Sequence, residues 1–188
     1  MANTDAPNGF TPAYHLTGGT IRSQEMRIAD GYAANIFNGD AVKLAADGTI
    51  QVAAAGDSLV GVFAGCSYTK ADGEIVFSKY WPTGTDVAGS YATAYVYDDP
   101  KIVFRAQFDG ASGIADIGQM ADLVAGTGST TTGRSAFEIS STTGTTTAQL
   151  RILDFVNSPS NDPASANAEA YVQIVEHEYA ESPVGSGI

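Results

Sequence analysis

The amino-acid sequence predicts an all-β protein, a small antiparallel barrel or sandwich with long loops and an extended N-terminal arm. Short runs in which apolar and polar residues alternate recur along the chain, as in strands with one buried face. Between these runs, many of the 21 glycines and 7 prolines stand where tight turns are expected. We therefore expect less than about 10% helix, far below the usual third of a globular protein.

Residues 1–20 are expected to form the arm, because its prolines forbid a helix and its glycines weaken a strand. Phe10, Tyr14 and Leu16 are spaced along this segment. Side chains of this kind become ordered only when they pack on something, since fixing each residue costs about 1–2 kcal/mol. The arm is thus expected to pack on its own domain or on a neighbouring subunit.

The first strands are expected within residues 28–67. A turn at 38–40, of the sequence Asn-Gly-Asp, leads into alternating residues at 41–44. Asp-Gly at 47–48 is a two-residue hairpin signal. Residues 60–68 form a β-branched run containing glycines, typical of a strand that another backbone approaches closely. Short strands so close together, with no helix between them, indicate a small antiparallel barrel.

The second half continues the same pattern. Its clearest alternation runs over residues 102–108. Residues 114–124 are compatible with one helical turn or a buried strand, and we favour a strand. Segments 136–140 and 149–156 are expected to pair with each other. Further strands are expected at 74–80, 92–97 and 171–179.

These elements predict one β domain over residues 21–180, or two fused β lobes at 21–81 and 90–180. A flexible tail follows at 181–188. A chain of this size buries roughly 70% of its extended surface, so its core needs no disulfide or metal. The single cysteine, Cys66, lies in an apolar run and is expected to be a small buried hydrophobe.

Charge argues against one class of partner, and hydropathy against another. The net charge is −12, and the nine basic residues are scattered rather than clustered. A DNA-binding protein gathers lysine and arginine on one face to neutralise phosphates, so no nucleic-acid partner is expected. No apolar run approaches the roughly 20 residues of a membrane span, so no membrane partner is expected either.

One segment imitates a nucleotide-binding loop. Residues 128–135 match the phosphate-binding pattern except that Arg134 stands in place of lysine. A working loop is followed by a helix whose N-terminus faces the phosphates. Residues 136–142 have the composition of a strand instead, so we expect a surface loop and no cofactor.

The remaining candidate chemistry is sparse. Asp98 and Asp99 precede Pro100, and neighbours in a strand point to opposite faces, so a capped turn is expected rather than a carboxylate pair. A calcium contribution from distant ligands is the alternative. His15 and His177 have no partner at metal-ligand spacing. We expect no metal site and no enzyme activity.

Several motifs occur in the order found in tailed-bacteriophage capsid cement (decoration) proteins, and the chain resembles this family over most of its length. The motifs are Asn8-Gly9-Phe10-x-Pro12, Gly39-Asp40-x-Val42, Gly61-Val62-Phe63-x-Gly65-Cys66-x-Tyr68, Trp81-Pro82, Val96-Tyr97-Asp98-Asp99-Pro100, Phe104-x-x-Gln107, Gly133-Arg134-Ser135 and Tyr171-Val172-x-Ile174.

The resemblance implies a structural virion protein with no catalytic residues, bound to the capsid exterior, where it bridges neighbouring major capsid proteins. An acidic protein suits that location, because packaged DNA repels it from the interior. Closed symmetry favours a homo-oligomer, with a trimer preferred over a dimer. The expected capsid or subunit contacts are Phe10, Pro12, Tyr14, Leu16 and Trp81.

The alternative function is a carbohydrate- or receptor-binding module of the virion. Exposed, clustered aromatic side chains would be its sign. The candidates for such a cluster are Tyr80, Trp81, Tyr95 and Tyr97.

Overall fold

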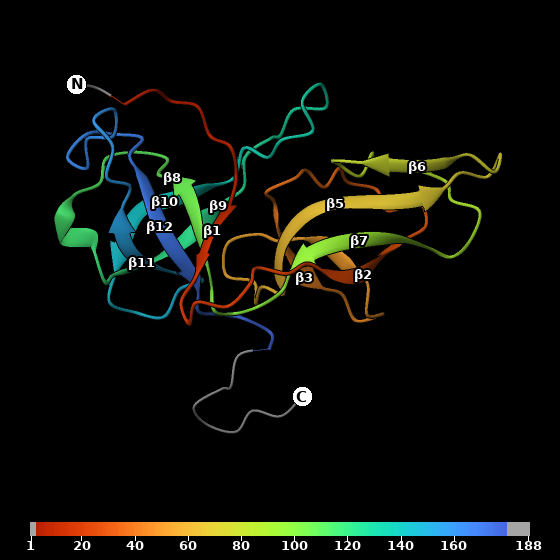
Figure 1. Ribbon diagram of the computed structural model, residues 1–188, viewed down its shortest axis with the longest axis horizontal. Coiled ribbons are helices and arrows are strands. Elements are labelled where there is room, and N and C mark those ends of the chain that lie inside the picture. The colour runs from red at the N-terminus through yellow and green to blue at the C-terminus, as the bar shows by residue number, and fades with distance from the viewer. Residues whose placement is uncertain (1–2, 180–188) are drawn as a thin grey trace.

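The computed structural model describes residues 3–179 of the protein. Over this range the chain forms twelve strands in two antiparallel sheets, which lie side by side (Figure 1). The only helical element in this range is a three-residue 3-10 turn, Ile114–Asp116. The all-β prediction is therefore confirmed. The architecture is sandwich-like, and neither sheet closes into a complete barrel.

Sheet A contains β1 and most strands of the second half of the chain. Its order is β1 (Thr11–His15), β8 (Ile102–Gln107), β12 (Glu169–Ile174), β11 (Leu150–Phe155), β9 (Met120–Val124) and β10 (Glu138–Gly144). A single bridge between Phe108 and Ile139 brings β10 back against the end of β8. The sheet is therefore strongly curled around its apolar interior, where Phe104 and Phe108 are buried.

Sheet B is built from the first half of the chain. Its order is β2 (Gln24–Ala29), β7 (Tyr91–Tyr97), β5 (Gly61–Thr69), β3 (Ala41–Leu44) and β4 (Ile50–Val52). The long strand β5 pairs with β3 at its start and with β6 (Ile75–Ser78) at its end. Trp81 is the largest side chain in the core on one face of this sheet.

The two sheets have separate cores, but β3 and β5 contribute to both. Ala41 and Val62 belong to the core of sheet A, whereas their neighbours Val42 and Phe63 belong to the core of sheet B. Successive side chains of a strand point to opposite faces, so each of these strands divides its apolar residues between the cores. The cores of the two sheets, which we call the two lobes, are thus joined through β3 and β5.

The expected arm is instead part of sheet A. Residues 11–15 form β1, which pairs with β8, and the preceding Phe10 is buried in the core. The glycines expected to weaken a strand, at 9, 18 and 19, lie outside β1, and Pro12 is tolerated because β1 is an edge strand. The register also shifts between Pro12 and Tyr14.

Two further expectations for the second half have mixed outcomes. The strand favoured within residues 114–124 is confirmed at β9, although a 3-10 turn precedes it. The expected pairing of 136–140 with 149–156 is wrong, because β9 lies between β10 and β11 and pairs with both. Ala121 of β9 faces Thr143 on one side and Leu150 on the other.

Replacement of Phe10 tests whether the arm belongs to the fold. Phe10→Ala should lower the free energy of unfolding by about 3–5 kcal/mol, because it leaves a cavity in the core. Tyr14→Ala, at a half-exposed position on the adjacent strand, should cost much less. Urea denaturation of both variants measures the difference, and equal losses would place Phe10 outside the core.

The predicted turn at 38–40 is confirmed and buries a carboxylate. Gly39 adopts a φ of +99°, and the Phe37 N–H donates to Asp40 Oδ2 at 2.7 Å. Burial raises the pKa of Asp40 to about 6, and hydrogen bonds from Ser135 and Phe37 only partly oppose this. The folded protein therefore holds a proton near pH 5 that the unfolded chain, with a pKa of 3.8, has released.

This proton links stability to pH. The contribution of protonated Asp40 is fully present below about pH 4 and is lost as the pH rises through about 6. Asp40→Asn keeps the shape without the charge, so it should stabilise the protein at pH 7 by up to about 3 kcal/mol. The gain over the natural sequence should shrink towards pH 4. Urea denaturation from pH 4 to 7 measures it, and a gain independent of pH would contradict this linkage.

Candidate interaction surface

Two of the five expected contact residues, Phe10 and Trp81, are buried inside the protein. Phe10 is buried in the core of sheet A, and its N–H donates to the Gly39 carbonyl at 2.9 Å. Trp81 is completely buried, packs edge-on against Tyr68 and donates from Nε1 to the Tyr32 carbonyl. Each side chain fills a core of its own protein, so neither offers exposed area to a partner.

The other three expected contacts lie at the surface along β1. Pro12 is half-buried, whereas Tyr14 and Leu16 are 43% and 44% exposed. The Tyr14 ring packs edge-on against Tyr171 of β12, with 5.6 Å between centroids. The Leu16 N–H donates to the Lys101 carbonyl, which holds the end of the segment in place. Tyr14 and Leu16 thus form a small, rigid apolar surface that we call the β1 patch.

The aromatic residues of the alternative function do not gather on one surface. Trp81 lies in the core, and Tyr80 stacks on Phe37 with ring centroids 5.5 Å apart. The Tyr95 hydroxyl is 3.2 Å from that of Ser67, and Tyr97 packs against the core of sheet A. This distribution does not provide the exposed aromatic cluster that a sugar-binding surface would use.

The largest exposed apolar side chains near one another lie on the outer face of sheet B. Ile75 and Phe77 of β6 are 68% and 75% exposed, and Tyr91 of β7 is 50% exposed. Cross-strand register places Phe77 beside Ser67 and Ile75 beside Thr69, on β5. Tyr95 and Phe77 both line a shallow hollow over Gly65. We call Ile75, Phe77, Tyr91 and Tyr95 the β6 patch.

The β6 patch is exposed to solvent because sheet A covers only part of the outer face of sheet B. Tyr97, at one end of β7, packs against the core of sheet A. Towards the other end of β7, the strands extend away from sheet A (Figure 1), and Tyr91 is half-exposed. The opposite face carries Cys66, Ala92 and the other residues of the Trp81 core.

The strand expected at 74–80 forms as β6, but its exposed face is not evident from the sequence. Ile75, Val76 and Phe77 are consecutive apolar residues, so alternation does not show which face is buried. The charges around the patch have both signs. Arg27 lies over the Tyr91 ring at 5.4 Å, and Lys70 forms an ion pair with Glu74 at the β5–β6 turn.

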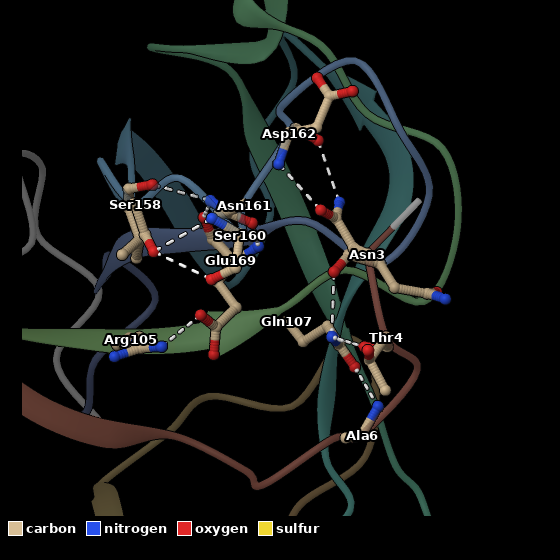
Figure 2. A network of polar contacts seen from close by, with 12 residues as sticks. Asn3, Thr4, Ala6, Arg105, Gln107, Ser158, Ser160, Asn161, Asp162 and Glu169 are labelled. Atoms are coloured by element: carbon tan, nitrogen blue, oxygen red, sulfur yellow. Dashed lines mark hydrogen bonds and ion pairs between the residues drawn. The ribbon is translucent and has the colours of Figure 1, made fainter. Parts of the chain in front are cut away.

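A polar network fixes the N-terminal segment to sheet A (Figure 2). The buried Gln107 amide accepts from the Ala6 N–H at 3.0 Å and donates to the carbonyls of Thr4 and Asn167. The Asn3 side chain bonds the backbone of Asp162 in both directions. Two hollows of about 190 and 220 Å³ flank this network. Both polar atoms of the Gln107 side chain form hydrogen bonds within the protein, so the network holds the N-terminal segment against sheet A.

The expected turn at 98–100 is confirmed, and it lies near both histidines. Asp99 accepts from the Lys101 N–H at 2.8 Å, which is the main cause of its lowered pKa, and from His15 Nε2 at 3.1 Å. Burial lowers the pKa of His177, while Asp98 and Asp99 act in the opposite direction. This convergence is not evident from the sequence. Within residues 3–179, no group of three or more His, Cys, Asp or Glu side chains is arranged to hold a metal ion.

The segment resembling a phosphate loop packs against the protein's own core. A Cβ at Gly128 would lie 2.3 Å from the Phe37 ring, so the loop has no room for a side chain there. The next regular element is the strand β10 rather than a helix, as expected. Cys66 is buried, and burial raises the pKa of its thiol to about 12, which confirms the expected small hydrophobe.

Comparison with known proteins identifies no relative: no family model, curated protein or solved structure matches the chain. No helix in the described part of the chain is long and apolar enough to span a membrane.

The structural role of Gln107 is testable. Gln107→Ala should lower the free energy of unfolding by about 1–3 kcal/mol, because it leaves partly buried backbone groups of the N-terminal segment without partners. Hydrogen exchange at the Ala6 amide should become faster. Gln119→Ala, which removes one exposed side-chain hydrogen bond to Ala115, is the control and should change stability by less than about 0.5 kcal/mol. Unchanged exchange at Ala6 would show that other contacts hold this segment.

Proposed function

We propose that this protein is a structural virion protein that binds the outer surface of a tailed-phage capsid and stabilises the shell by bridging neighbouring major capsid proteins. The ordered series of motifs that resembles those of capsid cement proteins supports this function. The net charge of −12 is also compatible with a position outside the packaged DNA.

The observation that carries the proposal is the β1 patch on a rigid β body. Tyr14 and Leu16 remain half-exposed although their backbone is fixed by β8 and by the Lys101 carbonyl. Side chains that are already ordered lose little conformational freedom on binding, so their apolar area contributes more of its full value. At about 25 cal/mol per Å², even a small patch adds substantial stabilisation when it is repeated over a capsid lattice.

The mechanism is mechanical rather than chemical. Each bound copy adds contact area between adjacent major capsid proteins after the shell has expanded, and this area opposes the internal pressure of the DNA. β3 and β5 of sheet B place side chains in both cores, so a force applied to one sheet is transmitted to the other through this shared packing. We place the protein on the capsid exterior, with the β1 patch as its main capsid contact.

Co-sedimentation with isolated expanded capsids tests the proposal. The natural protein should sediment with capsids at a fixed stoichiometry. The double variant Tyr14→Ser, Leu16→Ser should bind at least about tenfold more weakly, because it removes the apolar contact. Its melting temperature should change little, since both side chains are half-exposed.

Ile117→Ser is the matched control, because Ile117 is similarly exposed (40%) but lies beyond the 3-10 turn, outside the β1 patch. It should bind like the natural sequence. If the natural protein fails to sediment with capsids, the function is wrong. If the double variant binds normally, the contact lies elsewhere on the surface.

A further inference from the structure

The strand β6 ends sheet B with an unused edge. Within residues 3–179, β6 pairs with β5 alone. The Lys70 N–H donates to the Glu74 carbonyl at 2.9 Å, so these two opposite residues form a hydrogen-bonded pair of the β5–β6 ladder. Because hydrogen-bonded and non-hydrogen-bonded pairs alternate, the backbone groups of Ile75 and Phe77 point away from β5. These two residues therefore offer donors and acceptors to another strand.

The side chains of β6 do not protect this edge. Natural edge strands are usually blunted by charged or proline residues that discourage pairing. Here the two residues with outward-pointing backbone groups are also two of the most exposed apolar side chains, Ile75 and Phe77. A strand that exposes both its backbone groups and its apolar side chains is suited to pairing with another strand.

The sequence around β6 is complementary to itself. Asp72 and Glu74 precede the strand, where Glu74 also forms an ion pair with Lys70, and Lys79 follows it, so the two ends keep opposite net charges. In an antiparallel pair of two β6 strands, the acidic end of one copy lies beside the basic end of the other. This pairing of strands therefore brings opposite charges together, whereas the net charge of −12 makes whole molecules repel one another.

We infer that two copies of this chain associate through antiparallel pairing of their β6 strands about a two-fold axis at Val76. This register sets Ile75 of each copy opposite Phe77 of the other, so the outward N–H and C=O groups of both residues are paired. The outer faces of the two B sheets then form one continuous surface, with the Ile75 and Phe77 side chains in contact across the junction. The interface is isologous and closes at two copies, which selects the dimer over the trimer.

This inference concerns the protein in solution and does not depend on capsid binding. Sedimentation equilibrium of the full chain, from micromolar to millimolar concentration, should show a reversible monomer–dimer equilibrium. Ile75→Lys should weaken the dimer at least about tenfold. Ile114→Lys is the matched control, since Ile114 is 71% exposed against 68% for Ile75 but lies on the far lobe. It should leave the association constant unchanged.

A charge exchange tests the register. Lys79→Glu alone and Glu74→Lys alone each place like charges near both ends of the strand pair, so each variant should dimerise more weakly than the natural protein. An equimolar mixture of the two variants should restore the dimer, because each end then brings opposite charges together. Circular dichroism should show that all variants remain folded.

Several outcomes would overturn the inference. A monomeric natural protein over the whole concentration range would exclude self-pairing and leave the β6 edge to a different protein, such as a strand of the capsid. A trimer would exclude the two-fold interface. Dimers that persist in Ile75→Lys, or a mixture of the charge variants that stays monomeric, would place the interface elsewhere.

Discussion

The division of apolar side chains by β3 and β5 is the constraint on which the rest of the structure depends. Ala41 and Val62 face one core, and Val42 and Phe63 face the other. A shift of one residue in the pairing of these strands would exchange every side chain between the two cores. The register is secured where backbones approach closely, since a Cβ at Gly61 would lie 2.2 Å from the Tyr97 carbonyl oxygen. Both lobes therefore depend on one short stretch of paired backbone.

The same constraint explains where the surface remains available. Sheet A covers the outer face of sheet B only near the shared strands, so the far parts of β5, β6 and β7 keep one open face. The β1 patch arises differently, because β1 is an edge strand of sheet A whose outward side chains have no layer above them. The two patches lie on different lobes (Figure 1), so a copy bound through one still presents the other.

The sequence predicts the positions of the strands better than it predicts which strands pair with each other. Alternation in 102–108 and the turn residues at 38–40 are local signals, and both elements form as expected. The placement of β9 between β10 and β11 depends on contacts between distant segments, which alternation does not encode. The burial of Phe10 and Trp81 likewise follows from tertiary packing, since an apolar residue in a loop or arm is equally suited to a core or to a partner. At Ile75 and Phe77 the local signal was ambiguous, because both faces of the strand are apolar.

The position of the N-terminal segment has a consequence for synthesis on the ribosome. Asn3 bonds to the backbone near residues 162–166, and β1 joins a sheet whose other five strands all begin after residue 101. Asn3 therefore reaches its native partners only after residue 166 has been made, and β1 only after β8 has been made, whereas sheet B has all of its strands once residue 97 has emerged. Sheet B is thus able to form first during translation, while β1 stays unpaired and aggregation-prone until its partner strand β8 has emerged.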